Sequence, residues 1–174
     1  VGEALTCPVA WFTGERDLPA GYMPDTLNRQ RGDTAVYERE GSIVIAAPTE
    51  EGVTETPVLD IPRIRIPGRH NVENFMTAIA LTYGYADPAD VGAVADTFRG
   101  VPHRLELVRE IPREGGAIRF YNSSIDSSPT RTAAAVGALG ERSIVIICGG
   151  YDKQIPFEPL AETLISHRNI RAVV

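Results

Sequence analysis

The amino-acid sequence predicts an α/β protein in two parts, and three observations support this prediction. Residues up to about 66 contain short apolar segments separated by turns, residues 70–98 have helical periodicity, and strands alternate with helices after about residue 101. The sequence Gly100-Val101-Pro102 interrupts these patterns and indicates a boundary. We therefore expect two domains, residues 1–100 and 101–174, the second with a mainly parallel, Rossmann-like sheet.

The first part contains runs of β-branched and aromatic residues bounded by turn residues. The strands expected there cover residues 8–12, 34–39, 42–46 and 58–61. Residues 50–56 are expected to form an acidic loop. Residues 63–66 are expected to be extended at a sheet edge, because Pro62 and Pro67 flank them.

Two amphipathic helices are expected next. In the first, over residues 70–83, Val72, Phe75 and Met76 recur at a spacing that places them on one face. The second begins at Asp87-Pro88, because Asp is a preferred N-cap and Pro is favoured in the first turn of a helix.

The second part alternates strands with helices. Strands are expected over residues 105–111, 117–121, 143–148 and 172–174, and helices over residues 129–139 and 157–166. The apolar run 143–148 is typical of a buried parallel strand. Because ligands bind at the carboxyl ends of parallel strands, the following loop, Gly149 to Lys153, is a candidate site.

Composition and charge exclude several classes of partner. The net charge is −6 and no basic stripe is present, which argues against nucleic acid. The longest apolar run, residues 144–148, is far shorter than the ~20 residues of a membrane helix. Cys7 and Cys148 have no metal-binding or redox spacing and are expected to be buried, reduced thiols of a cytoplasmic protein. The start without Met and the strand-like end suggest a fragment.

Two clusters of polar residues lie before and at the expected boundary. Asn71 and Asn74, three residues apart, share a face in the first turns of a helix that follows a Pro-Gly turn. Their amides can pair with the N6 and N7 edge of adenine, or Asn71 is a cap and Asn74 is solvated. His103 and Arg104 follow in the boundary itself. Arg104 can bind phosphate or ribose oxygens, or it forms a salt bridge with Glu106. A lone histidine such as His103 is more often structural than catalytic.

A third cluster joins two loops of the second part. Residues 121–130 combine Asp126 with five hydroxyl side chains, which is more than one helix cap needs, although a capped loop with spare serines remains an alternative. The other loop carries Asp152 and Lys153, the single lysine in a chain with 16 arginines. A compact ammonium there can bind a carboxylate substrate. The sequence contains no nucleophilic triad, zinc motif, Walker loop or GxGxxG turn.

Together these segments resemble the Mur ligases, the ATP-dependent amide-bond-forming enzymes of peptidoglycan synthesis. The sequence from Gly68 to Asn74 is similar to the family's G-x-HN-x-x-N segment, and GVPHRLE, from Gly100 to Glu106, is similar to its interdomain segment. Residues 122–128 align with the family's NDSKATN loop, and residues 149–153 with its GG-x-x-K loop. The PHRLE form resembles the D-glutamate-adding branch.

The resemblance implies the end of a central ATP-binding domain followed by the start of a C-terminal domain. It implies a cytoplasmic, monomeric enzyme that joins D-glutamate to UDP-MurNAc-L-Ala through an acyl phosphate, with ATP and Mg²⁺. It places Asn71 and Asn74 by the adenine, and His103, Arg104 and Ser123 in the nucleotide site. Lys153 then binds the D-glutamate carboxylate as the catalytic lysine, with Ser127 assisting.

The sequence departs from the family pattern in two ways. Ser123 and Ile125 occupy the positions of the Asp and the Lys in the family's loop. Asp126 is an acid in the same loop, but it lies three residues after the position of the family's Asp. No GKT-type loop is present to hold a triphosphate, and the resemblance implies no metal ligand within these residues, so the chain alone is expected to be inactive. Two alternatives remain, namely another amide ligase of the folylpolyglutamate type and a non-catalytic nucleotide-binding module.

Overall fold

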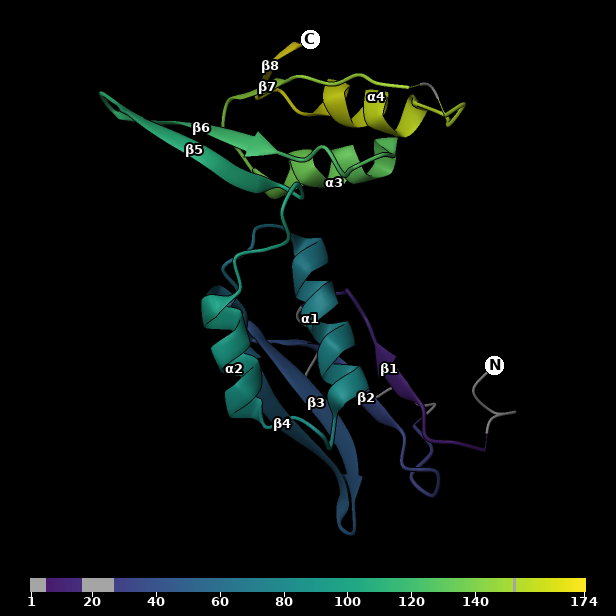
Figure 1. The fold of residues 1–174 in the computed structure, drawn as a ribbon. Coiled ribbons are helices and arrows are strands. Elements are labelled where there is room, and N and C mark those ends of the chain that lie inside the picture. The colour runs from purple at the N-terminus through teal and green to yellow at the C-terminus, as the bar shows by residue number, and fades with distance from the viewer. Residues whose placement is uncertain (1–5, 17–26, 152) are drawn as a thin grey trace. The chain divides into compact units, whose positions relative to one another are not determined.

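The computed structural model describes residues 6–16, 27–151 and 153–174. The chain divides into two compact units, Val1–Phe98 and Arg99–Val174. Each unit combines helices with strands, as Figure 1 shows, and the predicted α/β class is confirmed. No helix in the described ranges has the length and apolar character needed to cross a lipid bilayer.

The first unit is built on a four-stranded sheet in the order β1-β2-β3-β4. The strands are β1 (Ala10–Phe12), β2 (Thr34–Arg39), β3 (Ser42–Thr49) and β4 (Gly52–Asp60). β1 pairs with β2 in parallel, and the other two pairings are antiparallel. A short 3-10 helix, η2 (Ile61–Arg63), follows β4.

Two helices cover one face of this sheet: α1 (Arg69–Thr82) on β1 and β2, and α2 (Pro88–Thr97) on β4 (Figure 1). The apolar positions predicted for the first helix do face the core, with Met76 fully buried. The core between the layers consists of Val36, Ile43, Ile45, Leu59, Val72, Phe75, Met76, Ile79 and Ala95. The predicted start of α2 is confirmed, because the Asp87 side chain accepts a hydrogen bond from the Ala89 N–H.

Two expectations for the first unit are wrong. Residues 50–56 are not a loop, because Glu50 and Glu51 form only a tight turn and β4 starts at Gly52. Val53 packs against the second face of the sheet, and Glu55 on the same face accepts a hydrogen bond from Tyr37. This alternation is a strand signal that the acidic composition hides. Arg63 closes the 3-10 turn instead of extending along an edge, because the fixed backbone of Pro62 suits a first helical turn.

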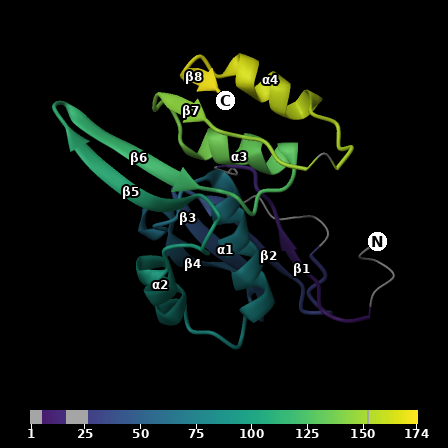
Figure 2. The same cartoon turned by 45° about the horizontal axis from the view of Figure 1, so that its top comes forward.

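The second unit begins with the antiparallel hairpin of β5 (Glu106–Arg113) and β6 (Gly116–Asn122), which Figure 2 shows clearly. It continues with α3 (Pro129–Ala138), β7 (Ile144–Ile146), α4 (Glu158–Ser166) and β8 (Ile170–Val173). β7 and β8 pair in parallel across α4, as expected for a strand–helix–strand unit, and α3 packs against α4. Only one of the two strand pairs described here is parallel, since β5 and β6 have no helix between them.

Burial in the second unit differs from the expectation. Ile144 is buried, but Val145 is 62% exposed and Ile147 is 84% exposed, so the run 143–148 is not a buried strand within this chain. Both cysteines, expected to be buried, are exposed and free. The apolar character of these residues therefore predicted more burial than the structure shows. A side chain is buried only where another helix or strand packs over it, and sequence periodicity does not reveal that packing.

Candidate functional site

The first turns of α1 present the two asparagines that sequence reasoning selected. Gly68 precedes the helix with φ of 101°, a conformation that suits glycine, and no side chain caps the helix. The Asn71 amide donates to the Pro67 carbonyl at 2.6 Å, and the Asn74 amide donates to Asn71 Oδ1 at 3.2 Å. Asn71 is therefore not the N-cap. Asn74 is exposed, and its Oδ1 has no protein partner among the described residues, so it can accept from a ligand.

A charged cluster that sequence reasoning missed holds this helix start in place. Arg69, the first residue of α1, donates to the Glu38 carboxylate on β2 and to the Gly14 carbonyl at 2.6 Å. Glu73 lies one turn further along α1, with its Oε1 3.9 Å from Arg69 Nε. A methyl group on Gly14 would lie 2.7 Å from Glu73 Oε1, so a larger residue at position 14 would displace the end of the Glu73 side chain. Only the four-residue spacing of Arg69 and Glu73 is visible in the sequence.

The boundary segment and the hydroxyl-rich loop form one hydrogen-bonded network in the second unit. The Leu105 N–H donates to Ser123 Oγ at 2.9 Å, and Ser123 Oγ donates to Asp126 Oδ2 at 2.6 Å. The Ile125 N–H donates to the His103 carbonyl at 3.2 Å. The structure thus brings together His103, Ser123 and Asp126 from loops about 20 residues apart.

Asn122 determines the tautomer of His103 in this network. Its Oδ1 accepts from the Ser124 N–H at 3.1 Å, which orients the amide and turns Nδ2 toward His103 Nδ1 at 2.9 Å. An amide nitrogen can only donate, so Nδ1 accepts and the neutral ring carries its proton on Nε2. His103 therefore links two loops through its ring.

Arg104 does not form the salt bridge with Glu106 that the sequence allowed. The Glu106 carboxylate accepts instead from the His103 N–H at 2.7 Å. The Arg104 side chain is exposed, and its guanidinium has no ion-pair partner among the residues that the structure describes. It can therefore bind an anion without first breaking an internal contact.

Lys153 and Ser127 lie on the surface of the second unit. Both residues are exposed, and Lys153 follows the left-handed glycines Gly149 and Gly150 in the loop after β7. Asp152, the acid beside it, lies outside the described residues. An exposed ammonium at the end of such a loop is accessible to a carboxylate from solution.

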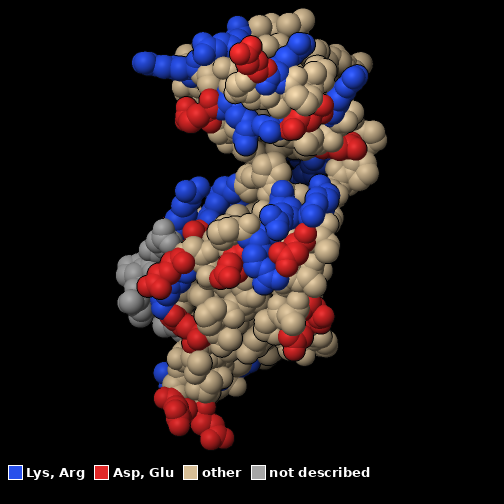
Figure 3. Space-filling model, turned by 90° about the vertical axis from the view of Figure 1, so that its left-hand side faces the viewer, with Lys and Arg blue, Asp and Glu red and all other residues tan. Residues whose placement is uncertain are grey.

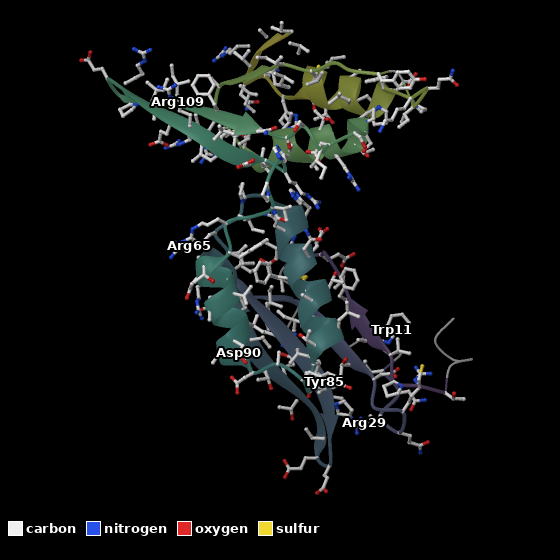
Figure 4. All side chains as sticks on the ribbon, viewed as in Figure 1. Trp11, Arg29, Arg65, Tyr85, Asp90 and Arg109 are labelled. Carbon is white, nitrogen blue, oxygen red and sulfur yellow. The ribbon has the colours of Figure 1, made fainter. Side chains whose placement is uncertain are left out.

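Charge is distributed unevenly along the chain. Residues 99–174 contain ten of the 17 basic side chains but only eight of the 23 acidic ones. Figure 3 shows basic and acidic groups on both units, with acidic groups at the end of the first unit that the β3–β4 turn forms. Figure 4 shows Arg109 on the β5–β6 hairpin as one of these basic groups.

No cluster of three His, Cys, Asp or Glu side chains suited to a metal occurs in the described ranges.

Comparison with known proteins agrees with these motifs. No protein-family model matches the chain. It is 41% identical over 129 residues to the UDP-N-acetylmuramoylalanine–D-glutamate ligase of Ruminiclostridium cellulolyticum, an alignment that covers 74% of this chain and 26% of that protein. It is 46% identical over 114 residues to the enzyme of that name from Acetivibrio thermocellus, covering 66% of this chain and 23% of that protein. The chain belongs to the Mur ligase family.

Solved structures support the Mur ligase fold. The UDP-N-acetylmuramate-alanine ligase MurC of Thermotoga maritima superposes with a TM-score of 0.52 at 20% identity, over 80% of this chain and 31% of that one. At this identity the match concerns the fold alone. This Mur ligase chain spans about a quarter of the length of the curated relatives it matches.

Proposed function

We propose that these residues are part of an enzyme that joins D-glutamate to UDP-MurNAc-L-Ala with ATP. The similarity to two ligases named for D-glutamate, at 41% and 46% identity, carries this proposal. The substrate carboxylate takes the γ-phosphoryl group of ATP to give an acyl phosphate and ADP. The D-glutamate amine then displaces phosphate and forms the amide bond. We further propose that the enzyme is cytoplasmic and monomeric.

Each unit has its own part in this proposal. Residues 1–100 form the end of the central ATP-binding domain, in which Asn74 pairs with the adenine edge and Asn71 orients it through the Asn74 amide. Residues 101–174 form the start of the C-terminal domain. There Arg104 binds an anionic or ribose oxygen of the nucleotide, with His103 and Ser123 supporting the loop. Lys153 binds a D-glutamate carboxylate with Ser127 beside it.

These residues do not themselves fit the triphosphate and its magnesium ion. The sequence has no glycine-rich phosphate loop, and the described residues form no acidic or histidine cluster for a cation. In this proposal, both groups are held by other parts of the full-length ligase. What these residues contribute is recognition of the base and of carboxylate and phosphate charge.

The test is a coupled assay of ADP release by the full-length ligase that carries these residues. We expect release to require both UDP-MurNAc-L-Ala and D-glutamate, with L-glutamate as the matched control that fails to replace the D isomer. We expect Arg104→Ala to raise the KM for ATP about tenfold, because a charge-assisted hydrogen bond contributes about this factor. No amide product with any combination of these substrates would refute the proposal.

One observation favours a second candidate, a nucleotide-binding module without ligase activity. Ser123 and Ile125 replace the acid and the lysine of the usual family loop, so two polar contacts of that loop are absent. This candidate predicts saturable ATP binding with no ADP release in the presence of any amino acid. A related amide ligase would instead turn over with a different amino acid in place of D-glutamate.

A further inference from the structure

The boundary segment holds two non-glycine residues in the left-handed backbone region, one on each side of Arg104. His103 has φ of 65° and Leu105 has φ of 46°. This region is unfavourable for side chains with a Cβ, and leucine visits it far less readily than asparagine. Two such residues within three positions require support from the surrounding structure.

The support is a set of hydrogen bonds to both strained residues. The His103 N–H is bound by the Glu106 carboxylate, and the Leu105 N–H is bound by the Ser123 hydroxyl, which Asp126 orients in turn. The His103 carbonyl and ring are also bound, by Ile125 and Asn122. The backbone on both sides of Arg104 is therefore fixed from the neighbouring loop.

Turn positions account for part of this conformation. His103 is the third residue of the turn that the Arg104 N–H closes on the Val101 carbonyl, with Pro102 second, and a type II turn has positive φ at that position. Glu40 also has positive φ, at 49°, and it precedes Gly41 in the two-residue turn between β2 and β3. That turn type needs positive φ at both central positions. Leu105 is at neither kind of position, because it follows the turn that ends at the exposed Arg104 and joins no pair of strands.

We infer that His103 and Leu105 are positioning residues, whose left-handed backbone holds the guanidinium of Arg104 outward for an anionic group of the nucleotide. The Arg104 N–H closes the turn on the Val101 carbonyl at 3.2 Å, so Arg104 stands in a tight turn with strained residues on both sides. The Glu106 carboxylate, the nearest acid to Arg104 in the sequence, accepts a hydrogen bond from the His103 N–H and forms no salt bridge with the Arg104 guanidinium. This inference rests on the proposed function, since it assigns Arg104 to the nucleotide.

The experiment compares Leu105→Val with Leu105→Asn in the full-length ligase. Valine keeps an apolar side chain but is β-branched and disfavours positive φ, whereas asparagine replaces the apolar side chain with an amide but tolerates positive φ. We expect Leu105→Val to raise the KM for ATP about tenfold, a loss typical of a misplaced binding group. Leu105→Asn should raise it less, and the KM for D-glutamate should change in neither variant.

Two further measurements separate this inference from a structural role. In an Arg104→Ala background, Leu105→Val should cause little additional rise in the KM for ATP, because the two residues act as a unit. Glu40→Val, which imposes the same backbone conflict far from the boundary segment in sequence, should lower the melting temperature without changing the KM for ATP. If Leu105→Val does not fold, His103→Val and His103→Asn replace the pair with the same expected order.

Three results would overturn the inference: equal KM values in the two variants, a larger rise in Leu105→Asn than in Leu105→Val, or an undiminished effect of Leu105→Val without Arg104. These results require a parent enzyme that releases ADP, so they leave the proposed function standing. A parent enzyme that neither binds ATP nor releases ADP would instead refute the proposed function and this inference together.

Discussion

The Glu38 carboxylate on β2 accepts a hydrogen bond from the guanidinium of Arg69, the first residue of α1. Glu38 is only 8% exposed, and Arg69 also donates to the Gly14 carbonyl at 2.6 Å. One guanidinium thus joins the start of α1 to the sheet and to the segment after β1. Since Asn71 and Asn74 lie within the next five residues, this contact also determines where their amides lie.

Glu38→Gln should destabilise the first unit by about 2 kcal/mol, because it removes the nearest counter-charge of a guanidinium that is only 22% exposed and leaves it Glu73 Oε1, 3.9 Å from its Nε. Urea denaturation followed by fluorescence measures this directly, since Trp11 is the single tryptophan and lies in the first unit. Glu40→Gln, on an exposed turn residue two positions away, is the control and should change stability by less than about 0.5 kcal/mol. Equal losses in the two variants would contradict the structure.

Met76→Ala should reduce the unfolding free energy of the first unit by about 2–5 kcal/mol, the usual range for truncating a fully buried side chain. Met76 is 0% exposed and packs between α1 and the sheet. Leu81→Ala on the same helix is the matched control, because Leu81 is 75% exposed. A comparable loss at Leu81 would mean that the face of α1 assigned to the core is wrong.

Asp33 should contribute to the pH dependence of stability. The Arg31 guanidinium, at 2.6 and 2.5 Å, and the N–H groups of Asn28 and Val9 hold the pKa of the Asp33 carboxyl far below its ordinary value. A pKa that is lower in the folded state stabilises the fold above the ordinary value of about 4. This contribution is lost progressively as the pH falls below about 4 toward the folded-state pKa.

The measurement is the urea midpoint of the parent chain and of Asp33→Asn at pH 7 and at pH 3. Asp33→Asn should have the lower midpoint at pH 7, and the gap between the two proteins should narrow at pH 3. Other carboxyl groups titrate in both proteins, so the difference between them isolates Asp33. A gap that is unchanged at the two pH values would show that the ionised Asp33 is not what Arg31 stabilises.

Lys153→Ala in the full-length ligase should raise the KM for D-glutamate tenfold or more, because one charge-assisted contact to a carboxylate contributes about that factor. The KM for ATP should change little. Arg142→Ala is the control, since Arg142 is an exposed cation of the same unit whose guanidinium donates to the Leu139 carbonyl. Steady-state kinetics with an unchanged KM for D-glutamate would exclude this role for Lys153.

Local patterns determined much of this protein. The helical period placed Val72, Phe75, Met76 and Ile79 on the buried face of α1, and Asp87-Pro88 marked the start of α2. These features depend on residues within one or two helical turns, which sequence spacing displays directly. The motif segments likewise indicated the family, because each of them is a short continuous stretch of the chain.

Tertiary structure alone decided the contacts that position the candidate site. Glu38 and Arg69 are 31 residues apart in the sequence, and Leu105 and Ser123, whose hydroxyl binds the Leu105 N–H, are 18 residues apart. Neither pair can be predicted from local sequence spacing. The left-handed backbone at Leu105 was equally invisible, because leucine ordinarily avoids it and adopts it only where surrounding hydrogen bonds compensate the strain. Sequence motifs thus selected the candidate site residues. The orientation of their side chains depends on packing and hydrogen bonds between residues far apart in the sequence, which only the folded chain brings together.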